Sequence, residues 1–219
     1  MVTTYAEPPP RLRRFQERYP ALTYPRKTRL HAAGDKANHI YLLVDGTTKI
    51  SKISYTKQPL ITLLHSGELW GQSLFANESN DVWTSGADTA TTISMHRFPA
   101  EDFRRAAAND AKLMHWVAVK LRERTLRVER QLELMHTSRV EHRLMLTLAD
   151  IAEETAGGQP EEGKPVEIPL TQGELASLVG ATRETTSTIL NLFVRRGFVQ
   201  LRRGAVFVLS CEMLRAAVC

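Results

Sequence analysis

Two neighbouring side chains, Arg183 and Glu184, are of the types that read base pairs in the major groove of DNA. An arginine can donate two hydrogen bonds to O6 and N7 of guanine, and a glutamate can accept one from the amino group of cytosine. On a helix, the 3.6-residue period places Ser187 and Thr188 on the same side as this pair. The four residues therefore predict a helix face that contacts DNA bases.

Capping residues around this segment indicate two helices joined by a short turn. Thr171 and Glu174 form the Thr-x-x-Glu capping box of a helix start, and Gly180 gives the backbone the freedom to end that helix. Thr182 can cap a second helix. The packing face of that helix would carry Thr186, Ile189 and Phe193. The stretch 170–197 therefore predicts a helix-turn-helix, although an ordinary pair of core helices would show similar caps.

The charge of the chain favours a polyanionic partner. Its net charge is +5 and its isoelectric point is about 9.4. Between Arg183 and Arg203 there are five arginines and a single acid, Glu184, which leaves a local charge of +4. This local excess predicts contacts with the phosphates of double-stranded DNA. With 42% hydrophobic residues among 219, the chain can bury one large core or two smaller ones.

Several other classes of protein do not fit the sequence. Cys211 and Cys219 are too few and too late for a disulfide framework, an iron-sulfur cluster or a four-cysteine zinc site. The seven histidines form no metal-like pair, and no nucleophile has a plausible base beside it. We therefore predict no cofactor, no metal and no enzymatic activity. Because no apolar run reaches the roughly eighteen residues of a membrane span, we expect a cytoplasmic protein without membrane contact.

The first half of the chain predicts a β domain. Residues 1–20 read as a loose arm followed by a short helix, and short apolar segments separated by turn residues follow up to about Phe98. The run Ile40–Val44, followed by Asp45-Gly46, is typical of a β-hairpin. Short strands at this spacing favour an antiparallel barrel or jelly roll, which together with the helices makes an α+β protein.

A long helix is predicted to follow the barrel, over about 109–135. Apolar or small residues recur in it at alternating steps of four and three, which is the pattern of a coiled-coil seam. These positions are Met114, Ala118, Leu121, Thr125, Val128, Leu132 and Met135. The pattern predicts a homodimer that forms through residues 114–135. The alternative is a helix that lies along its own domain.

The last third of the chain predicts a compact domain that begins after Thr137-Ser138, where the helical pattern is interrupted. A new amphipathic helix starts at Val140, and two strands on either side of Arg203-Gly204 form a hairpin, the wing of a winged helix. The predicted domains are therefore a β-barrel with its arm (1–108), a dimerisation helix (109–137) and a winged helix-turn-helix domain (138–219).

This order of elements resembles the CRP/FNR superfamily of bacterial transcription regulators. The most specific matches are VGATRET (179–185), GELWGQSLF (67–75) and HAAGDKANHIYLLVDG (31–46). The resemblance implies that Arg183 and Glu184 read bases. It also implies that four further residues hold phosphates: Thr171, Gln172, Thr182 and Thr185. Thr188 departs from the family, because many relatives have a second arginine there, so we expect a looser outer position in the half-site.

The resemblance also implies an effector pocket in the barrel, but its key residues differ. In the cyclic-AMP-binding branch a glutamate holds the ribose and an Arg-Ser or Arg-Thr pair holds the phosphate. Gln72 stands at the glutamate position, and the stretch 80–88 (NDVWTSGAD) contains no basic residue. The candidate pocket residues are Gly67, Glu68, Gly71, Gln72, Ser73, Asp81, Val82, Arg124 and Thr125. We therefore predict that cyclic AMP does not bind there, and the effector stays unknown.

The predicted function is that of a homodimeric, sequence-specific DNA-binding regulator acting on a near-palindromic site. The loop 157–164 resembles the region by which relatives touch RNA polymerase, which is therefore an expected partner. Three alternatives stay open at this point. The barrel could bind a small molecule while the C-terminal domain binds protein, the barrel could be an enzyme fused to a helix-turn-helix, or it could bind haem as one branch of the family does.

Overall fold

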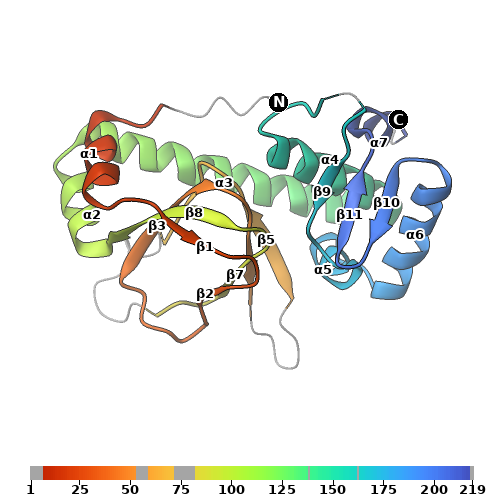
Figure 1. The fold of residues 1–219 in the computed structure, drawn as a ribbon, viewed down its shortest axis with the longest axis horizontal. Helices are drawn as coiled ribbons and strands as arrows, with labels where there is room; N and C mark the ends of the chain where they lie inside the picture. Colours follow the sequence, from red (N-terminus) through yellow and green to blue (C-terminus); the bar gives the residue numbers. More distant parts are fainter. Residues whose placement is uncertain (1–6, 53–58, 72–81, 138, 162, 218–219) are drawn as a thin grey trace. The chain divides into compact units, whose positions relative to one another are not determined.

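The computed structural model describes residues 7–52, 59–71, 82–137, 139–161 and 163–217. The chain divides into two compact units. The first contains residues 1–53 and 63–129, and the second contains residues 54–62 and 130–219. The first unit contains the barrel, as the sequence predicted (Figure 1). The strands of the barrel and the helices beside them run in the order α1 (Pro10–Arg18), β1 (Leu22–Tyr24), β2 (Arg29–His31), β3 (His39–Asp45), β4 (Thr48–Ser51), β5 (Leu60–Leu64), β6 (Leu69–Trp70), β7 (Gly86–Thr89), β8 (Ile93–Pro99) and α2 (Ala100–Ala108).

The strands form two four-stranded sheets in the orders β1-β8-β3-β6 and β2-β7-β4-β5. The predicted hairpin at Asp45-Gly46 is wrong in one respect, because β3 pairs with β8 and β6 whereas β4 pairs with β7. The turn itself is present, and Gly46 has the positive φ of 86° that it needs. A Cβ at this position would lie 2.4 Å from the carbonyl oxygen of Thr92. The turn therefore carries the chain from one sheet to the other, as a jelly roll requires.

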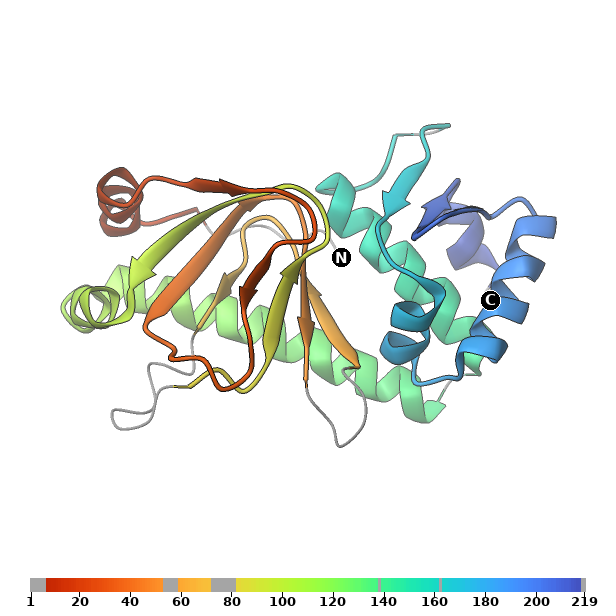
Figure 2. The same cartoon turned by 60° about the horizontal axis from the view of Figure 1, so that its bottom comes forward.

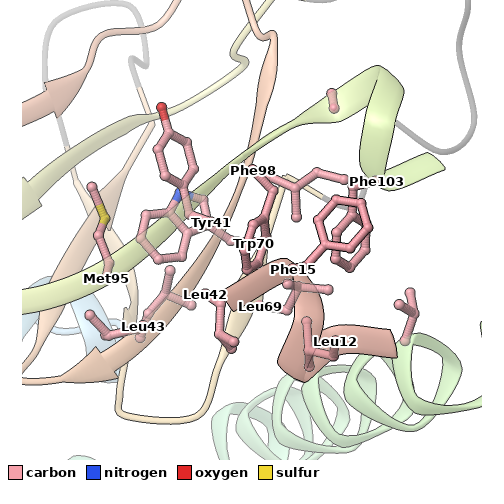
Figure 3. Packing of buried hydrophobic residues seen from close by; sticks show 14 of the residues in the cluster. Leu12, Phe15, Tyr41, Leu42, Leu43, Leu69, Trp70, Met95, Phe98 and Phe103 are labelled. Carbon is pink, nitrogen blue, oxygen red and sulfur yellow. The ribbon is translucent and has the colours of Figure 1, made fainter. Parts of the chain in front are cut away.

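An apolar core joins the barrel to its flanking helices (Figure 3). Phe15 of α1, Phe98 of β8 and Phe103 of α2 form a three-ring cluster with centroids 5.3 to 5.8 Å apart. Beside it, Tyr41 stacks on Trp70 across β3 and β6 at 4.7 Å. Edge-to-face and stacked pairs at such distances add to the free energy of apolar burial. The core therefore fixes α1 and α2 against the first sheet.

The long helix α3 (Ala111–Thr137) carries two separate apolar stripes. One stripe, Leu113, Trp116 and Val117, is buried in the barrel core, and both ribbon views show this part of the helix alongside the strands (Figures 1 and 2). The other is the predicted seam, whose large apolar residues are exposed in the single chain. Leu121, Val128 and Leu132, for example, are 41%, 48% and 51% exposed. The helix therefore packs along its own domain and still presents the seam.

The C-terminal unit contains the predicted helix-turn-helix and wing (Figure 1). Its three-stranded sheet has the order β10-β11-β9, all antiparallel, and lies against α4 and α6. The elements are α4 (Val140–Ala156), β9 (Val166–Ile168), α5 (Gln172–Val179), α6 (Arg183–Arg195), β10 (Val199–Arg202), β11 (Ala205–Val208) and α7 (Cys211–Ala216). The α+β fold class, with a jelly roll followed by a winged helix-turn-helix, is confirmed. Among the helices described, none is both long and apolar enough to cross a membrane.

Two histidines of the barrel are buried in their neutral form. His31 is 5% exposed and stacks on Trp83 with ring centroids 4.0 Å apart. Burial lowers the pKa of His31 from 6.5 to about 4. Burial, and then the positive charge of Arg127, lower the pKa of His65 from 6.5 to about 4 as well. Protonation therefore favours the unfolded chain, in which both imidazoles reach water.

Acid should consequently destabilise the barrel at a pH where most carboxylates are still charged. Since the folded pKa of both histidines lies below the unfolded one, their full contribution to stability is present above pH 6.5 and is lost as pH falls towards about 4. The loss should approach on the order of 3 kcal/mol for each histidine. Denaturant unfolding between pH 7 and 4.5 measures it. His31→Phe keeps an aromatic ring on Trp83 and should flatten the profile, whereas an unchanged slope in this variant contradicts the assignment.

Candidate DNA-binding surface

The first helix of the motif begins and ends where its capping residues predict. The N–H of Glu174 donates to Thr171 Oγ1 at 3.2 Å, and the N–H of Thr171 donates to Glu174 Oε2 at 2.7 Å, which completes the capping box. At the other end Gly180 adopts a left-handed conformation with φ 61° and ψ 48°. These local interactions satisfy backbone groups that a helix leaves open at its ends. Three residues, 180–182, then connect α5 to α6.

The second helix, α6, divides into a buried face and an exposed face. Thr182 caps it by accepting from the N–H of Thr185 at 3.1 Å. The buried positions are Thr186, Leu190 and Phe193, each 0% exposed. Ile189, which the sequence placed on this face, is only half-buried, and Leu190 is the buried residue one turn after Thr186. Steps of three and four and steps of four and three both suit one helix face, so packing in the folded domain decides which residue is fully buried.

The predicted base-reading residues lie on the outer face of α6. Arg183, Glu184 and Thr188 are exposed, and Ser187 is half-buried. The hydroxyl of Thr188 donates to the carbonyl oxygen of Glu184 at 3.0 Å. Because its proton is held by the helix backbone, Thr188 presents a methyl group and an oxygen acceptor to the outside. Such a side chain lacks the paired donors with which an arginine clamps guanine.

A basic groove of about 530 Å³ runs between the start of α5, the start of α6 and the wing. Arg183, Arg202 and Arg203 supply its positive charge. Its remaining lining residues are Leu170, Thr171, Gln172, Gly173, Leu201, Gly204, Ala205 and Val206. The guanidinium of Arg202 lies 4.6 Å from the ring centroid of Phe207, which restricts its motion, while Arg203 occupies the tip of the hairpin. The groove thus collects donors of the kind that hold phosphates.

The wing arginines were counted in the local charge of the sequence but were not assigned to the site. The signal available in the sequence was the basic pair Arg202-Arg203 before Gly204, at the turn of the predicted hairpin. What the sequence did not show is that the hairpin folds back beside Thr171 and Gln172, some thirty residues earlier in the chain. The structure therefore brings together the predicted phosphate-holding residues of α5 and two arginines outside the predicted set.

A second group of predicted residues lies in the barrel, around Glu68. This carboxylate is 7% exposed and its Oε2 lies 2.6 Å from the guanidinium of Arg127 on α3. Its Oε1 accepts from the N–H of His65 at 3.2 Å. Burial raises the pKa of Glu68, and the positive charges of Arg127 and Arg124 oppose that shift. Glu68 thus forms an ion pair with Arg127, which lies one helical turn beyond Arg124 of the predicted pocket set.

The structure describes some of the other predicted pocket residues but not all of them. Gln72, Ser73 and Asp81 lie outside the described residues. Val82 is 53% exposed and pairs with Lys36 in an isolated β-bridge, and Thr125 lies on the seam of α3. Gly67 and Gly71 both have positive φ, of 82° and 96°. At Gly71 a Cβ would lie 2.9 Å from the carbonyl oxygen of His39, so the backbone approach there requires glycine.

Comparison with known proteins gives matches to both halves of the chain. The model of the cyclic nucleotide-binding domain matches residues 21–110, and that of the Crp-like helix-turn-helix domain matches residues 127–217. A CRP-like cAMP-activated global transcriptional regulator of Mycobacterium tuberculosis is 26% identical over 193 residues, which is 87% of this chain and 84% of that protein. The cAMP-activated global transcriptional regulator CRP of Haemophilus influenzae is 22% identical over 188 residues, with 84% and 82% covered.

Solved structures show the same fold. The c-di-GMP responsive global regulator CLP of Xanthomonas campestris superposes with a TM-score of 0.72 at 23% identity, over 90% of this chain and 97% of that one. A CRP-family transcriptional regulator from Thermus thermophilus superposes with a TM-score of 0.73 at 18% identity, over 90% and 96%. The two domain matches follow one another along the chain, and the second helix of the capped pair exposes Arg183 and Glu184. The chain therefore belongs to the CRP/FNR type of DNA-binding transcription regulators.

Proposed function

We propose that the protein acts as a homodimer that binds a near-palindromic DNA site, with one α6 helix in each of two successive major grooves. The observation that carries this proposal is the start of α6, where Arg183 and Glu184 are exposed on a helix whose opposite face is buried. The N-terminal residues of a recognition helix are those that reach base edges. Thr171, Gln172, Thr182 and Thr185 lie at the starts of the two helices, from which the flanking phosphates are held.

The seam of α3 supports the dimer. Seven positions with coiled-coil spacing lie on one helix, and the large apolar ones among them are exposed, while a different stripe of the same helix serves the barrel core. An exposed apolar stripe of this length on a regular helix is typical of a helix–helix interface. A two-fold pair of seams also gives the two-fold symmetry that a palindromic site requires.

For the effector, we propose that the barrel does not use cyclic AMP. Glu68 places a buried carboxylate against Arg127, so the arginine nearest to it is already engaged by the protein itself. A cyclic phosphate needs a basic partner when it leaves water, and the stretch 80–88 provides none. The regulator then responds to a ligand other than a cyclic nucleotide, or acts without one. RNA polymerase is the proposed protein partner, through the loop 157–164.

Selection of bound duplexes from a random DNA pool, with and without cyclic AMP, tests this function. We expect a near-palindromic consensus whose half-sites contain one strongly selected G·C pair, because Arg183 supplies one arginine clamp at the start of α6. The same consensus and the same yield should result when cyclic AMP is added. Recovery of unrelated sequences would contradict sequence-specific recognition, and enrichment only with cyclic AMP would contradict the proposed absence of that effector.

The wing should contribute affinity without sequence preference. Arg203→Ala removes one phosphate contact from each half-site, so the slope of log K against log salt should become shallower by about 0.9 per contact, or about 1.8 per dimer. The relative affinities for different sequences should stay unchanged, because phosphates carry no base information. Titrations at several salt concentrations measure the slope. Arg14→Ala on α1 removes the same charge elsewhere and serves as the control, and an equal change in both variants refutes a wing contact.

A further inference from the structure

Residues 180–182, between α5 and α6, are called the recognition turn here. Hydrogen bonds at the end of helix α5 hold this turn in place. A helix leaves its last four carbonyl groups without partners inside the helix, and buried ones must find partners elsewhere. Backbone N–H groups of the turn donate hydrogen bonds to two of these carbonyl groups. The N–H of Ala181 donates to the carbonyl oxygen of Ala176 at 2.9 Å, and the N–H of Gly180 donates to that of Ser177 at 3.4 Å. The carbonyl groups of Leu178 and Val179 in the helix, and that of Gly180 after it, bind partners outside the turn.

Side chains from two other helices bind these remaining carbonyls. Gln131 Nε2 of α3 donates to the carbonyl oxygen of Leu178 at 2.8 Å. Arg143 of α4 donates from Nε to the carbonyl oxygen of Val179 at 2.8 Å and from a terminal nitrogen to that of Gly180 at 3.3 Å. A cation at the C-terminus of a helix is also favoured by the helix dipole. The turn before the recognition helix is therefore held from α3 and from α4 at once.

Gln131 differs from Arg143 in the helix to which it belongs. It lies next to Leu132, the most exposed large residue of the seam, on an uninterrupted helix that runs from Ala111 to Thr137. The residues of α3 from 130 onward cluster with the C-terminal unit. Met135, one turn further, has its Cε 3.7 Å from the place that a Cβ on Gly180 would occupy. The last turns of the seam helix thus touch the turn of the helix-turn-helix directly.

The geometry points to Gln131 as a positioning residue that sets the spacing at which the dimer recognises its two half-sites. The inference rests on the proposed homodimer. The hydrogen bond between Gln131 and the end of α5 holds the turn before α6 against the last seam residues, Leu132 and Met135, which belong to the same unit. Only a short turn separates that bond from Arg183, so a change at the turn is transmitted to the start of α6. Gln131 touches no DNA in this role and leaves the base contacts of each half-site unchanged.

Gln131→Met tests the role, because methionine has a similar length and helix propensity but no donor. Duplexes carrying the two selected half-sites at the selected spacing, the same half-sites moved apart by about two base pairs, and a single half-site are compared. The variant should bind the selected spacing about tenfold more weakly, because one hydrogen bond is lost in each protomer. Its affinity for the single half-site and for the altered spacing should equal that of the original protein.

Two further comparisons separate positioning from packing. Gln131→Glu has the size of glutamine but places a carboxylate against the Leu178 carbonyl, so it should lose the spacing preference at least as far as the methionine variant. His136→Ala, at an exposed position of the same helix, should retain it. Retention of the preference by both Gln131 variants overturns the inference, and so does an equal loss on every duplex including the single half-site. A failure of the proposed dimeric recognition is recognised separately, since the unaltered protein would then show no spacing preference.

Discussion

Replacing Arg183 with alanine should abolish the preference for one G·C pair in each half-site, at about 1–3 kcal/mol of discrimination per pair. Arg183 is exposed at the first position of α6 and lines the basic groove. A positive side chain at a helix N-terminus is opposed by the helix dipole, so its removal should leave the stability of the helix intact. Competition binding with duplexes that carry each of the four base pairs at the selected position measures the effect.

Two variants distinguish base reading from simple attraction to DNA. Arg183→Lys keeps the charge but loses the planar fork, so binding should persist while discrimination between G·C and the other pairs falls. Arg203→Ala should weaken all sequences to the same extent. If Arg183→Ala likewise weakens every sequence equally, then Arg183 holds a phosphate, and the reading role assigned to it is wrong.

A charge in the seam of α3 should separate the protomers. Leu132 is 51% exposed in the single chain, and Leu132→Glu would place two carboxylates against apolar side chains in a paired seam. Each leucine that is no longer buried removes about 1.5–3 kcal/mol of apolar stabilisation. Loss of the dimer should then weaken binding to a two-half-site duplex by about 10²- to 10⁴-fold, because the second half-site no longer benefits from linkage. Analytical ultracentrifugation and DNA titration measure both effects.

Leu126 provides the matched control for this experiment. It lies on the same helix and is 46% exposed, but it stands outside the seam spacing. Leu126→Glu makes the same chemical change and should leave the oligomeric state as it is. Binding of Leu132→Glu to a single half-site should also match that of the original protein, because the seam does not contact DNA in this arrangement. A dimer that survives Leu132→Glu would show that another surface joins the protomers.

Features that depend on neighbours in the sequence were predictable. Thr171 and Glu174 form the capping box within one turn, Gly180 ends the helix through its own φ, and Thr182 caps the next helix three residues before its donor. These interactions are local, so a short stretch of residue types is enough to indicate them. The exposed seam of α3 was predictable for the same reason, since its residues repeat along a single helix. The resemblance to a known family added the phosphate-holding residues of the two helices and the candidate effector pocket.

Contacts between distant residues were decided by the tertiary structure. The Asp45-Gly46 turn was predicted, but which sheet each flanking strand joins depends on β7 and β8, some forty residues later. The bond from Gln131 to Leu178 spans 47 positions, and that from Arg127 to Glu68 spans 59. No periodic pattern marks such pairs, because their geometry is set by the packing of whole elements. The sequence thus determined the capped helix pair and the seam, whereas only the folded chain decided which arginines line the groove and which side chains bind the carbonyl groups at the end of α5.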